Sequence, residues 1–144
     1  GGRALMSLRL EKGWGAWGLE FRPDFNAVEA GMDVFINWKK DFVGKEATQQ
    51  FLADGVTRKL VTMMVETEID VTLDEAVLSD SEAVGYITSG GYAHHVKRSM
   101  AMAYVAADYA VAGTKLDVEI LGQICAAEVL GGPIYDANGA NMRA

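Results

Sequence analysis

The sequence predicts an α+β protein in which an N-terminal arm of helices and loops leads into a small antiparallel β-barrel, jelly-roll-like in character. Two observations predict this class. Apolar residues in the first part of the chain recur at helical spacing, whereas from Val56 onward their period drops to two. The second part also contains about five or six short strand candidates divided by glycine and aspartate turns, a pattern typical of small barrels.

Charge changes at the same point as periodicity. Residues 1–59 carry nine basic and eight acidic side chains, whereas residues 60–144 carry four basic and twelve acidic ones. All three tryptophans also lie in the first part. We therefore expect a boundary near Asp54-Gly55, which divides the chain into residues 1–54 and 55–144.

The arm begins with a helix expected from Ala4 to Lys12, because this segment is rich in good helix formers and Gly13 stands in the usual stop position. Leu5, Leu8 and Lys12 share one stripe of this helix. The glycine-rich segment that follows has no period and is expected to be a loop.

Three further elements complete the arm. Asn26 is placed to cap a short turn that runs through Gly31, and residues 33–38 are expected to form a strand. Residues 41–53 are expected to form a helix, which Gly55 follows. The apolar side of that helix would consist of Phe42, Val43, Ala47, Phe51 and Leu52.

The clearest strand alternation runs from Leu116 to Ile120, where apolar and acidic residues take turns. The other expected strands are rich in Val, Leu, Ile and Met. They span residues 58–65, 84–88, 100–105 and 125–130. Met63, Met64, Met100 and Met102 are expected to be core residues.

Composition excludes several classes of function. The net charge of −7, from 13 basic and 20 acidic residues, is opposite to that of a general nucleic-acid binder. No apolar run reaches the roughly 18 residues of a membrane helix, and the first residues have no signal-peptide layout. A single cysteine, Cys125, fits a reducing compartment. We therefore expect a soluble intracellular protein without nucleic-acid or membrane partners.

No complete catalytic or metal site is recognisable. His94 and His95 are adjacent, so on a strand they would point to opposite faces, and no third ligand completes a set. Cys125 lies in an apolar strand and is expected to be a buried, inert thiol. Ser89-Gly90-Gly91 resembles an anion-holding glycine turn, but a simple tight turn is the favoured interpretation.

Arg9 is the most informative polar residue, because it lies on the margin of the expected apolar stripe. Its stem can be buried while its guanidinium reaches a carboxylate or a carbonyl-rich heterocycle. A structural ion pair with Glu11, Glu20 or Glu29 is the alternative. Trp14 and Trp17 nearby would suit a flat, partly anionic ligand.

Residues 66–82 form an acidic stretch with seven acids and no bases. A solvated loop or hairpin edge is the simplest interpretation of this stretch. The alternative is a cation site, or a binding surface for a basic partner on a stand-alone interaction barrel.

Several motifs follow one another in an order that resembles a known family. They are Ser7 to Gly13, Ala16 to Glu20, Val28 to Gly31, Asp41 to Ala47, Thr88 to Tyr92 and Arg98 to Val105. Together they resemble the tetrahydrofolate-binding aminomethyltransferase fold of glycine-cleavage T-protein. The likeness is closer to the C-terminal folate-binding region of dimethylglycine and sarcosine dehydrogenases. Two departures from T-protein point to the dehydrogenase branch: Val34 replaces an aromatic residue, and Gly91 to His94 replaces an SxSP-like segment.

The resemblance implies a function for the longer protein. Residues 1–54 would be the end of the folate-binding aminomethyltransferase domain, and residues 55–144 its C-terminal β-barrel domain. An upstream FAD-containing domain would oxidise an N-methylated glycine, and the folate module would capture the one-carbon unit as methylenetetrahydrofolate. A T-protein-like aminomethyltransferase or a folate-dependent demethylase is the alternative. The protein would reside in the bacterial cytoplasm or the mitochondrial matrix.

The resemblance also assigns two ligand-binding residues. Arg9 matches the family arginine that reaches tetrahydrofolate, and Trp17 matches an aromatic position in the same motif, with the loop from Trp14 to Trp17 helping to close the cleft. The family's acidic catalytic residue and its pterin-anchoring glutamate lie upstream of Gly1. No catalytic residue and no metal ligand is therefore expected here, and residues 1–144 alone are expected to lack turnover.

Overall fold

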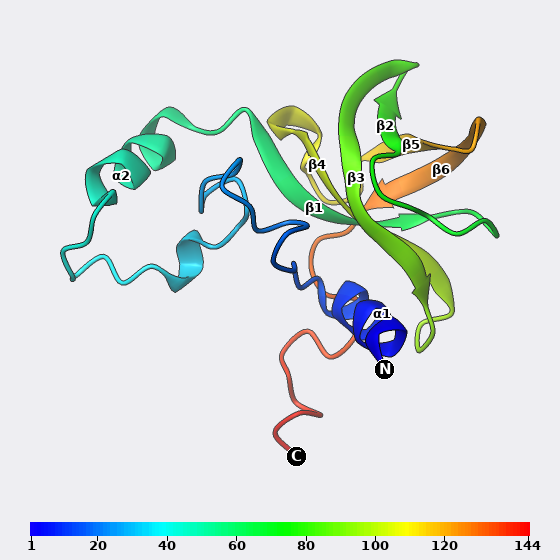
Figure 1. Ribbon diagram of the computed structural model, residues 1–144, viewed down its shortest axis with the longest axis horizontal. Coiled ribbons are helices and arrows are strands. Elements are labelled where there is room, and N and C mark those ends of the chain that lie inside the picture. The colour runs from blue at the N-terminus through cyan, green and yellow to red at the C-terminus, as the bar shows by residue number, and fades with distance from the viewer.

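A closed antiparallel barrel of six strands forms the centre of the structure, a computed structural model that describes residues 1–144 (Figure 1). Its strands are β1 (Arg58–Val65), β2 (Ala76–Ser79), β3 (Glu82–Ala93), β4 (Arg98–Ala106), β5 (Lys115–Ile120) and β6 (Gln123–Val129). They pair in the order β1-β4-β3-β2-β5-β6, and β6 closes the barrel against β1. The expected α+β class and small antiparallel barrel are confirmed.

The sequence predicted five of the six strands. The unpredicted strand, β2, lies inside the acidic stretch, where its four residues pair with β3 on one side and β5 on the other. Val77 of β2 is fully buried in the barrel. The strand has only four residues and is flanked by acidic residues, so its apolar–polar alternation is too short to recognise. The sequence therefore predicted a solvated loop for the whole stretch.

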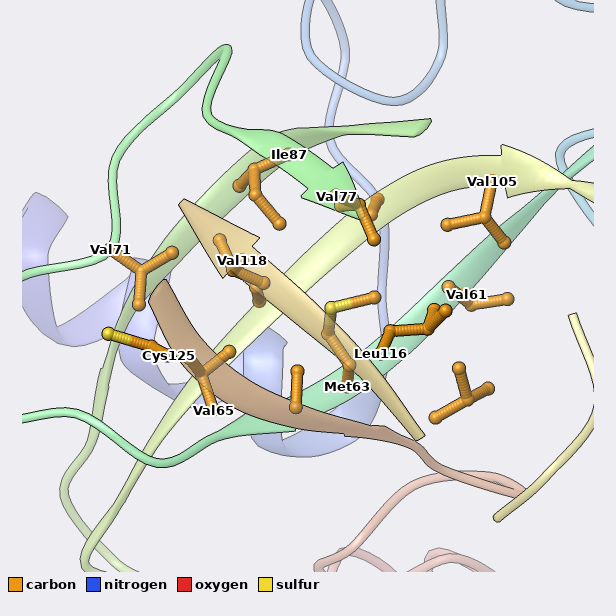
Figure 2. Packing of buried hydrophobic residues seen from close by; sticks show 14 of the residues in the cluster. Val61, Met63, Val65, Val71, Val77, Ile87, Val105, Leu116, Val118 and Cys125 are labelled. Carbon is orange, nitrogen blue, oxygen red and sulfur yellow. The ribbon is translucent and has the colours of Figure 1, made fainter. Parts of the chain in front are cut away.

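The barrel interior is filled by side chains that alternate with outward-facing residues along each strand (Figure 2). On β1 and β5 the burial pattern has the period of two that the sequence indicated. Met63 is fully buried in this interior, as expected, and Cys125 is buried at its edge. The interior is therefore a packed apolar core rather than a ligand cavity.

Strand β4 differs from the others because it is buried on both faces. Ala101, Ala103 and Val105 point into the barrel, whereas Met100 and Met102 form a second apolar cluster on the outside, together with Leu10. The expectation that Met100 and Met102 are core residues is confirmed, although their core lies outside the barrel. The outer face of β4 is the surface on which the N-terminal arm packs.

Helix α1 (Gly2–Lys12) brings the arm onto that surface. It ends where expected, with Gly13 in the left-handed conformation (φ 64°), and packs against β3 and β4. The expected apolar stripe is not the buried one, since Leu5 and Leu8 are 65% and 59% exposed. The buried face consists of Ser7, Arg9, Leu10 and Glu11. The Ser7 hydroxyl donates to the Tyr92 carbonyl, and Glu11 Oε1 accepts the backbone N–H of His95.

The rest of the arm departs further from expectation. Residues 33–38 do not form a strand, because the local hydrogen bonds of the 3-10 helix η1 (Asp33–Phe35) take the place of strand pairing. Helix α2 (Lys45–Asp54) begins four residues later than expected, after Gly44 in a left-handed conformation (φ 87°).

The apolar side expected for this helix is exposed at Phe42, Val43, Phe51 and Leu52. Figure 1 shows α2 extending away from the barrel. A second 3-10 helix, η2 (Ala107–Tyr109), follows β4. None of the helices is long and apolar enough to cross a membrane.

Candidate functional site

The candidate site lies between α1, the loop that follows it, and the outer face of β3 and β4. Strand β3 contains a β-bulge at this face. Ile87 pairs with Ala103, but the next pair is Ser89 with Met102, so Thr88 is the extra residue. Such a bulge turns the following side chain. Thr88 uses its hydroxyl to bond the Met102 carbonyl oxygen at 3.1 Å, and Ser89 contacts the arm. Ser89-Gly90-Gly91 is thus part of a strand, and the expected tight turn is wrong.

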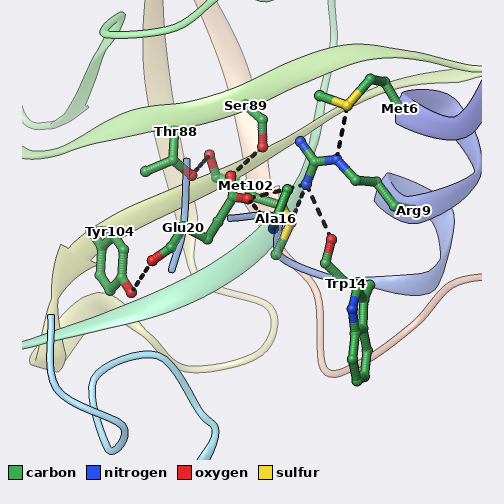
Figure 3. Close-up of polar contacts among 9 residues, drawn as sticks. All are labelled: Met6, Arg9, Trp14, Ala16, Glu20, Thr88, Ser89, Met102 and Tyr104. Carbon is green, nitrogen blue, oxygen red and sulfur yellow. Dashed lines mark hydrogen bonds and ion pairs between the residues drawn. The ribbon is translucent and has the colours of Figure 1, made fainter. Parts of the chain in front are cut away.

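An ion pair between Arg9 and Glu20 forms the centre of the site (Figure 3). Arg9 Nη1 lies 3.2 Å from Glu20 Oε2, and the two side chains are 7% and 0% exposed. The structure therefore selects Glu20 from the three acids that the sequence offered as partners. Because both charges are withdrawn from water, each depends on the other for compensation.

Glu20 is held by donors from three further elements. Its Oε2 accepts the backbone N–H of Ala16 at 2.8 Å, and its Oε1 accepts the hydroxyl of Ser89. Its backbone carbonyl accepts the hydroxyl of Tyr104 at 3.0 Å. Burial raises the pKa of Tyr104 above its ordinary value, and the nearby charges of Glu29 and Glu20 raise it further. Tyr104 is therefore a neutral donor at physiological pH.

Arg9 uses two of its three guanidinium nitrogens within the protein. Besides Glu20, Nη1 donates to the Trp14 carbonyl at 3.1 Å and approaches Met102 Sδ at 3.5 Å, while Nε donates to Met6 Sδ at 3.3 Å. Arg9 Nη2 is buried and has no hydrogen-bond partner. Figure 3 shows this nitrogen on the side of Ser89 and Met6, away from Trp14. A buried N–H group without an acceptor is unusual in a folded protein.

Two grooves flank this ion pair. The first, which we call the aromatic groove, has a volume of about 600 Å³ and is lined by residues that include Trp14, Trp17, Glu20, Phe21 and Phe25. The second, the α1–β3 groove, has a volume of about 870 Å³, and Met6, Ser7, Leu10, Gly90 and Gly91 are among its lining residues. Met6, which contacts Arg9 Nε, lines the α1–β3 groove, whereas Arg9 itself lines neither groove.

Trp17, the second residue expected to bind ligand, lies in the aromatic groove. It is 88% exposed and makes an edge-on contact with Phe21 at a centroid distance of 6.4 Å. Glu20 lines the same groove as Trp17, but Arg9 does not, so the structure does not bring the two expected ligand-binding residues together in one groove.

A stacked cluster fixes the wall of the aromatic groove to the barrel. Phe25 stacks on Tyr104 with ring centroids 3.6 Å apart, and the guanidinium of Arg58 covers the Phe25 ring at 4.6 Å. Arg58 also pairs with Glu29 at 2.9 Å. Glu29 in turn belongs to the turn that Asn26 caps, as expected, through hydrogen bonds to the N–H groups of Val28 and Glu29.

Sequence reasoning identified Arg9 but not Ser89 or Tyr104 as parts of this network. The two glycines after Ser89 indicated a turn rather than a hydrogen-bonding role. Tyr104 lies in an apolar strand, so it was interpreted only as a strand residue. Elsewhere, His94 and His95 are exposed, and no group of three or more His, Cys, Asp or Glu side chains is arranged to hold a metal ion.

Comparison with known proteins gives one consistent result. Residues 58–136 match the model of the glycine cleavage T-protein C-terminal barrel domain. The chain is 37% identical to human mitochondrial dimethylglycine dehydrogenase over 134 residues, which is 91% of this chain and 16% of that protein. It is 34% identical to an aminomethyltransferase from Picosynechococcus sp. over 134 residues, 92% of this chain and 37% of that protein.

A solved structure is similar as well. The crystal structure of glycine cleavage system aminomethyltransferase T from Bartonella henselae superposes with a TM-score of 0.86 at 27% identity. The match covers 93% of this chain and 38% of that one. The chain therefore spans well under half the length of the relatives it resembles, and the likeness extends through the arm as well as the barrel.

Proposed function

This chain belongs to the family of glycine cleavage T-protein C-terminal barrel domains, and we propose that it forms one wall of the tetrahydrofolate site of a larger one-carbon-transfer enzyme. In this proposal residues 1–54 are the end of the folate-binding domain and residues 55–144 are the C-terminal barrel domain. When bound, tetrahydrofolate would accept the one-carbon unit. The chain's own residues would bind and orient it.

The observation that carries this proposal is the unpartnered Nη2 of Arg9. A buried guanidinium nitrogen that lacks an acceptor destabilises the folded protein by about 1–3 kcal/mol. A ligand oxygen that accepted its hydrogen bond would remove this penalty. The aromatic groove, which Glu20 lines, supplies apolar and aromatic walls suited to a heterocycle. The residues present therefore fit a folate-type ligand, with Arg9 as its hydrogen-bond donor and Trp17 as a contact at the rim.

We propose further that the whole protein is a dehydrogenase of the dimethylglycine or sarcosine type, with FAD on an upstream domain. The identity to dimethylglycine dehydrogenases supports this branch, as do Val34 and the segment from Gly91 to His94 in place of the T-protein residues. The N-methylated glycine would then be oxidised upstream, in the bacterial cytoplasm or the mitochondrial matrix. Purification of the full polypeptide with bound flavin would support this branch.

An aminomethyltransferase without flavin is the second candidate, favoured by identities of 33–35% to bacterial aminomethyltransferases. This candidate would be supported if the full-length protein contains no flavin and transfers an aminomethyl carbon to tetrahydrofolate. In either case we expect residues 1–144 alone to lack turnover, because the family resemblance assigns no catalytic residue to them. Activity of the isolated chain would contradict that expectation.

Calorimetry with tetrahydrofolate tests the role of Arg9. The full polypeptide should bind, and Arg9→Lys should weaken binding about fivefold or more, because lysine can pair with Glu20 but cannot provide a second nitrogen. Arg98→Ala removes the exposed guanidinium at the first residue of β4, which lines neither groove, and serves as the control. Equal affinity of wild type and Arg9→Lys would mean that Arg9 is only a structural ion-pair partner.

A further inference from the structure

The hairpin that joins β5 to β6 has an apolar residue in an unfavourable backbone conformation. Ile120 pairs with Gln123, so Leu121 and Gly122 alone form the connection, and both have positive φ angles, 49° and 78°. Two positive φ angles are the pattern of a type I′ turn, which prefers asparagine, aspartate or glycine at its first position. Glycine aside, Leu121 is the only apolar residue of the chain with a positive φ. This conformation is unfavourable for a bulky side chain.

Nothing within the folded chain compensates for the conformation of Leu121. Its side chain is 79% exposed, and it belongs to neither apolar cluster of the protein. Leu121 therefore departs from local backbone preference without any gain in buried apolar area. Departures of this kind concentrate at functional sites. The position of Leu121 indicates a contact with another molecule.

The barrel surface beside this hairpin is also uncovered. In the barrel order β5 is reached from β4 either through β3 and β2 or through β1 and β6, so it lies opposite the strand on which the arm packs. Figure 1 shows β5 and β6 on the side of the barrel away from α2. The outward residues pair across the two strands, Glu119 with Ile124 and Asp117 with Ala126, and Ile124 is 59% exposed. We call these four residues and Leu121 the β5–β6 surface.

The β5–β6 surface is negatively charged as well as apolar. Its two acids, Asp117 and Glu119, form no ion pair. Lys115 is the only basic residue of β5 and β6, and it is paired with Glu128. On the other side of β5, strand β2 has no charged residue, and the two residues before it, 74 and 75, are both acidic. No basic residue of these strands is therefore free to balance Asp117 and Glu119.

We propose that the β5–β6 surface binds an amphipathic segment of a separate protein. Apolar side chains of the segment would cover Leu121 and Ile124, and its lysine or arginine residues would pair with Asp117 and Glu119. Charge complementarity selects a basic partner, because an acidic segment, or the same surface of a second copy, would be repelled. A neutral segment would withdraw the carboxylates from water without pairing them.

The opposite positions of β4 and β5 determine the source of the segment. In the proposed function the upstream domains pack on the arm, which covers β4, so they leave β5 accessible. The segment therefore comes from another protein rather than from the same polypeptide. Only this choice of source rests on the proposed function.

Fluorescence anisotropy of a labelled peptide tests the proposal on the full polypeptide. The probe is a synthetic helical peptide with leucine on one face and lysine on the other, and a second peptide has glutamate in place of lysine. The variants are Leu121→Asn, Glu119→Lys and, as the control, Val111→Asn. Val111 is also exposed, at 61%, but it precedes β5 and so lies at the other end of that strand from Leu121. Thermal denaturation is measured for each variant.

Leu121→Asn should change binding and stability in opposite directions. It should weaken the leucine–lysine peptide about fivefold or more, because the main apolar contact is lost. It should also raise the melting temperature, because Asn-Gly is a preferred type I′ dipeptide. Val111→Asn should leave the affinity unchanged. Equal affinity of wild type and Leu121→Asn, or equal losses in Leu121→Asn and Val111→Asn, would overturn the inference.

Glu119→Lys tests the charge of the surface. It should weaken the leucine–lysine peptide at low ionic strength, and its difference from wild type should disappear as salt is added. Binding of the glutamate peptide as tightly as the lysine peptide would overturn the inference, as would the absence of any peptide binding to the wild type. Peptide binding as expected, in a polypeptide that does not bind tetrahydrofolate, would overturn the proposed function alone.

Discussion

The hydroxyl of Ser89 donates a hydrogen bond to Glu20 Oε1 between residues 69 positions apart in the sequence. This contact joins the N-terminal arm to the barrel through buried polar groups. It places Glu20, the ion-pair partner of Arg9, beside the bulge of β3.

Replacing Ser89 with alanine should destabilise the protein by about 1–3 kcal/mol, because Glu20 Oε1 would stay buried without a donor. Urea denaturation measures the free energy of unfolding. Ser79→Ala on β2 is a matched control, since that serine is only half-buried. If both variants lose the same small amount, the hydroxyl of Ser89 has no special role at the junction.

Gly90→Ala should be destabilising for a steric reason. A Cβ at this position would lie 2.6 Å from Val71 Cγ1 and 2.7 Å from the Val71 carbonyl oxygen, so the loop over β3 would have to move. Overpacking of this kind costs about 1–3 kcal/mol. The melting temperature should fall clearly for Gly90→Ala and hardly at all for Gly132→Ala, where a Cβ would meet nothing within 4 Å. An unchanged melting temperature for Gly90→Ala would contradict the close packing of Val71 on β3.

Tyr104 should make stability depend on alkaline pH. Its pKa in the folded protein is raised above the ordinary value of about 10, so between these two values the unfolded chain loses a proton that the folded chain keeps. Stability contributed by this group is complete below pH 10 and is lost as the pH rises further. The slope should approach about 1.4 kcal/mol per pH unit.

Urea denaturation at pH 9 and pH 11 measures that slope. Tyr104→Phe should reduce the slope by the contribution of one proton, because the titrating phenol is removed. Tyr104→Phe should also lose about 1 kcal/mol at neutral pH through the hydrogen bond to the Glu20 carbonyl. An identical slope in wild type and Tyr104→Phe would show that the phenol titrates normally.

Trp17 should affect ligand binding without affecting stability. Because its side chain is 88% exposed, Trp17→Ala should change the free energy of unfolding by less than about 0.5 kcal/mol. If Trp17 contacts the ligand as proposed, tetrahydrofolate should quench its fluorescence, and the alanine variant should bind about 0.5–1.5 kcal/mol more weakly. Unchanged fluorescence and affinity would leave Trp17 as an exposed rim residue.

The barrel was largely predictable from the sequence because its strands obey a simple rule. One face of β5 meets the core and the other meets water, so Leu116 to Ile120 alternate visibly. The prediction failed where burial depends on distant partners. The buried face of α1 is mainly polar, and Arg9 and Glu11 can be buried there only because Glu20 and the backbone N–H of His95 lie opposite them.

The candidate site was predictable only in part for the same reason. Arg9 could be recognised from its motif. Which acid pairs with it depends on the path of the loop after α1, which brings Glu20 to the guanidinium. The position of Ser89 depends on a one-residue bulge at Thr88, which no local pattern indicates. Leu5 and Leu8 have a helical apolar spacing, yet no element of this chain covers them.

The double burial of β4 has a consequence for how the molecule opens. This strand is paired along both edges, with β1 and β3, and it is covered from inside by the core and from outside by α1 and Phe25. Its amide hydrogens should therefore exchange with deuterium only when the whole barrel unfolds, whereas those of α2, which has no buried residue, should exchange early. Met102, which contacts Arg9, and Tyr104, which binds the Glu20 carbonyl, both belong to β4. The β4 side of the Arg9 site should therefore keep its structure until the whole barrel unfolds.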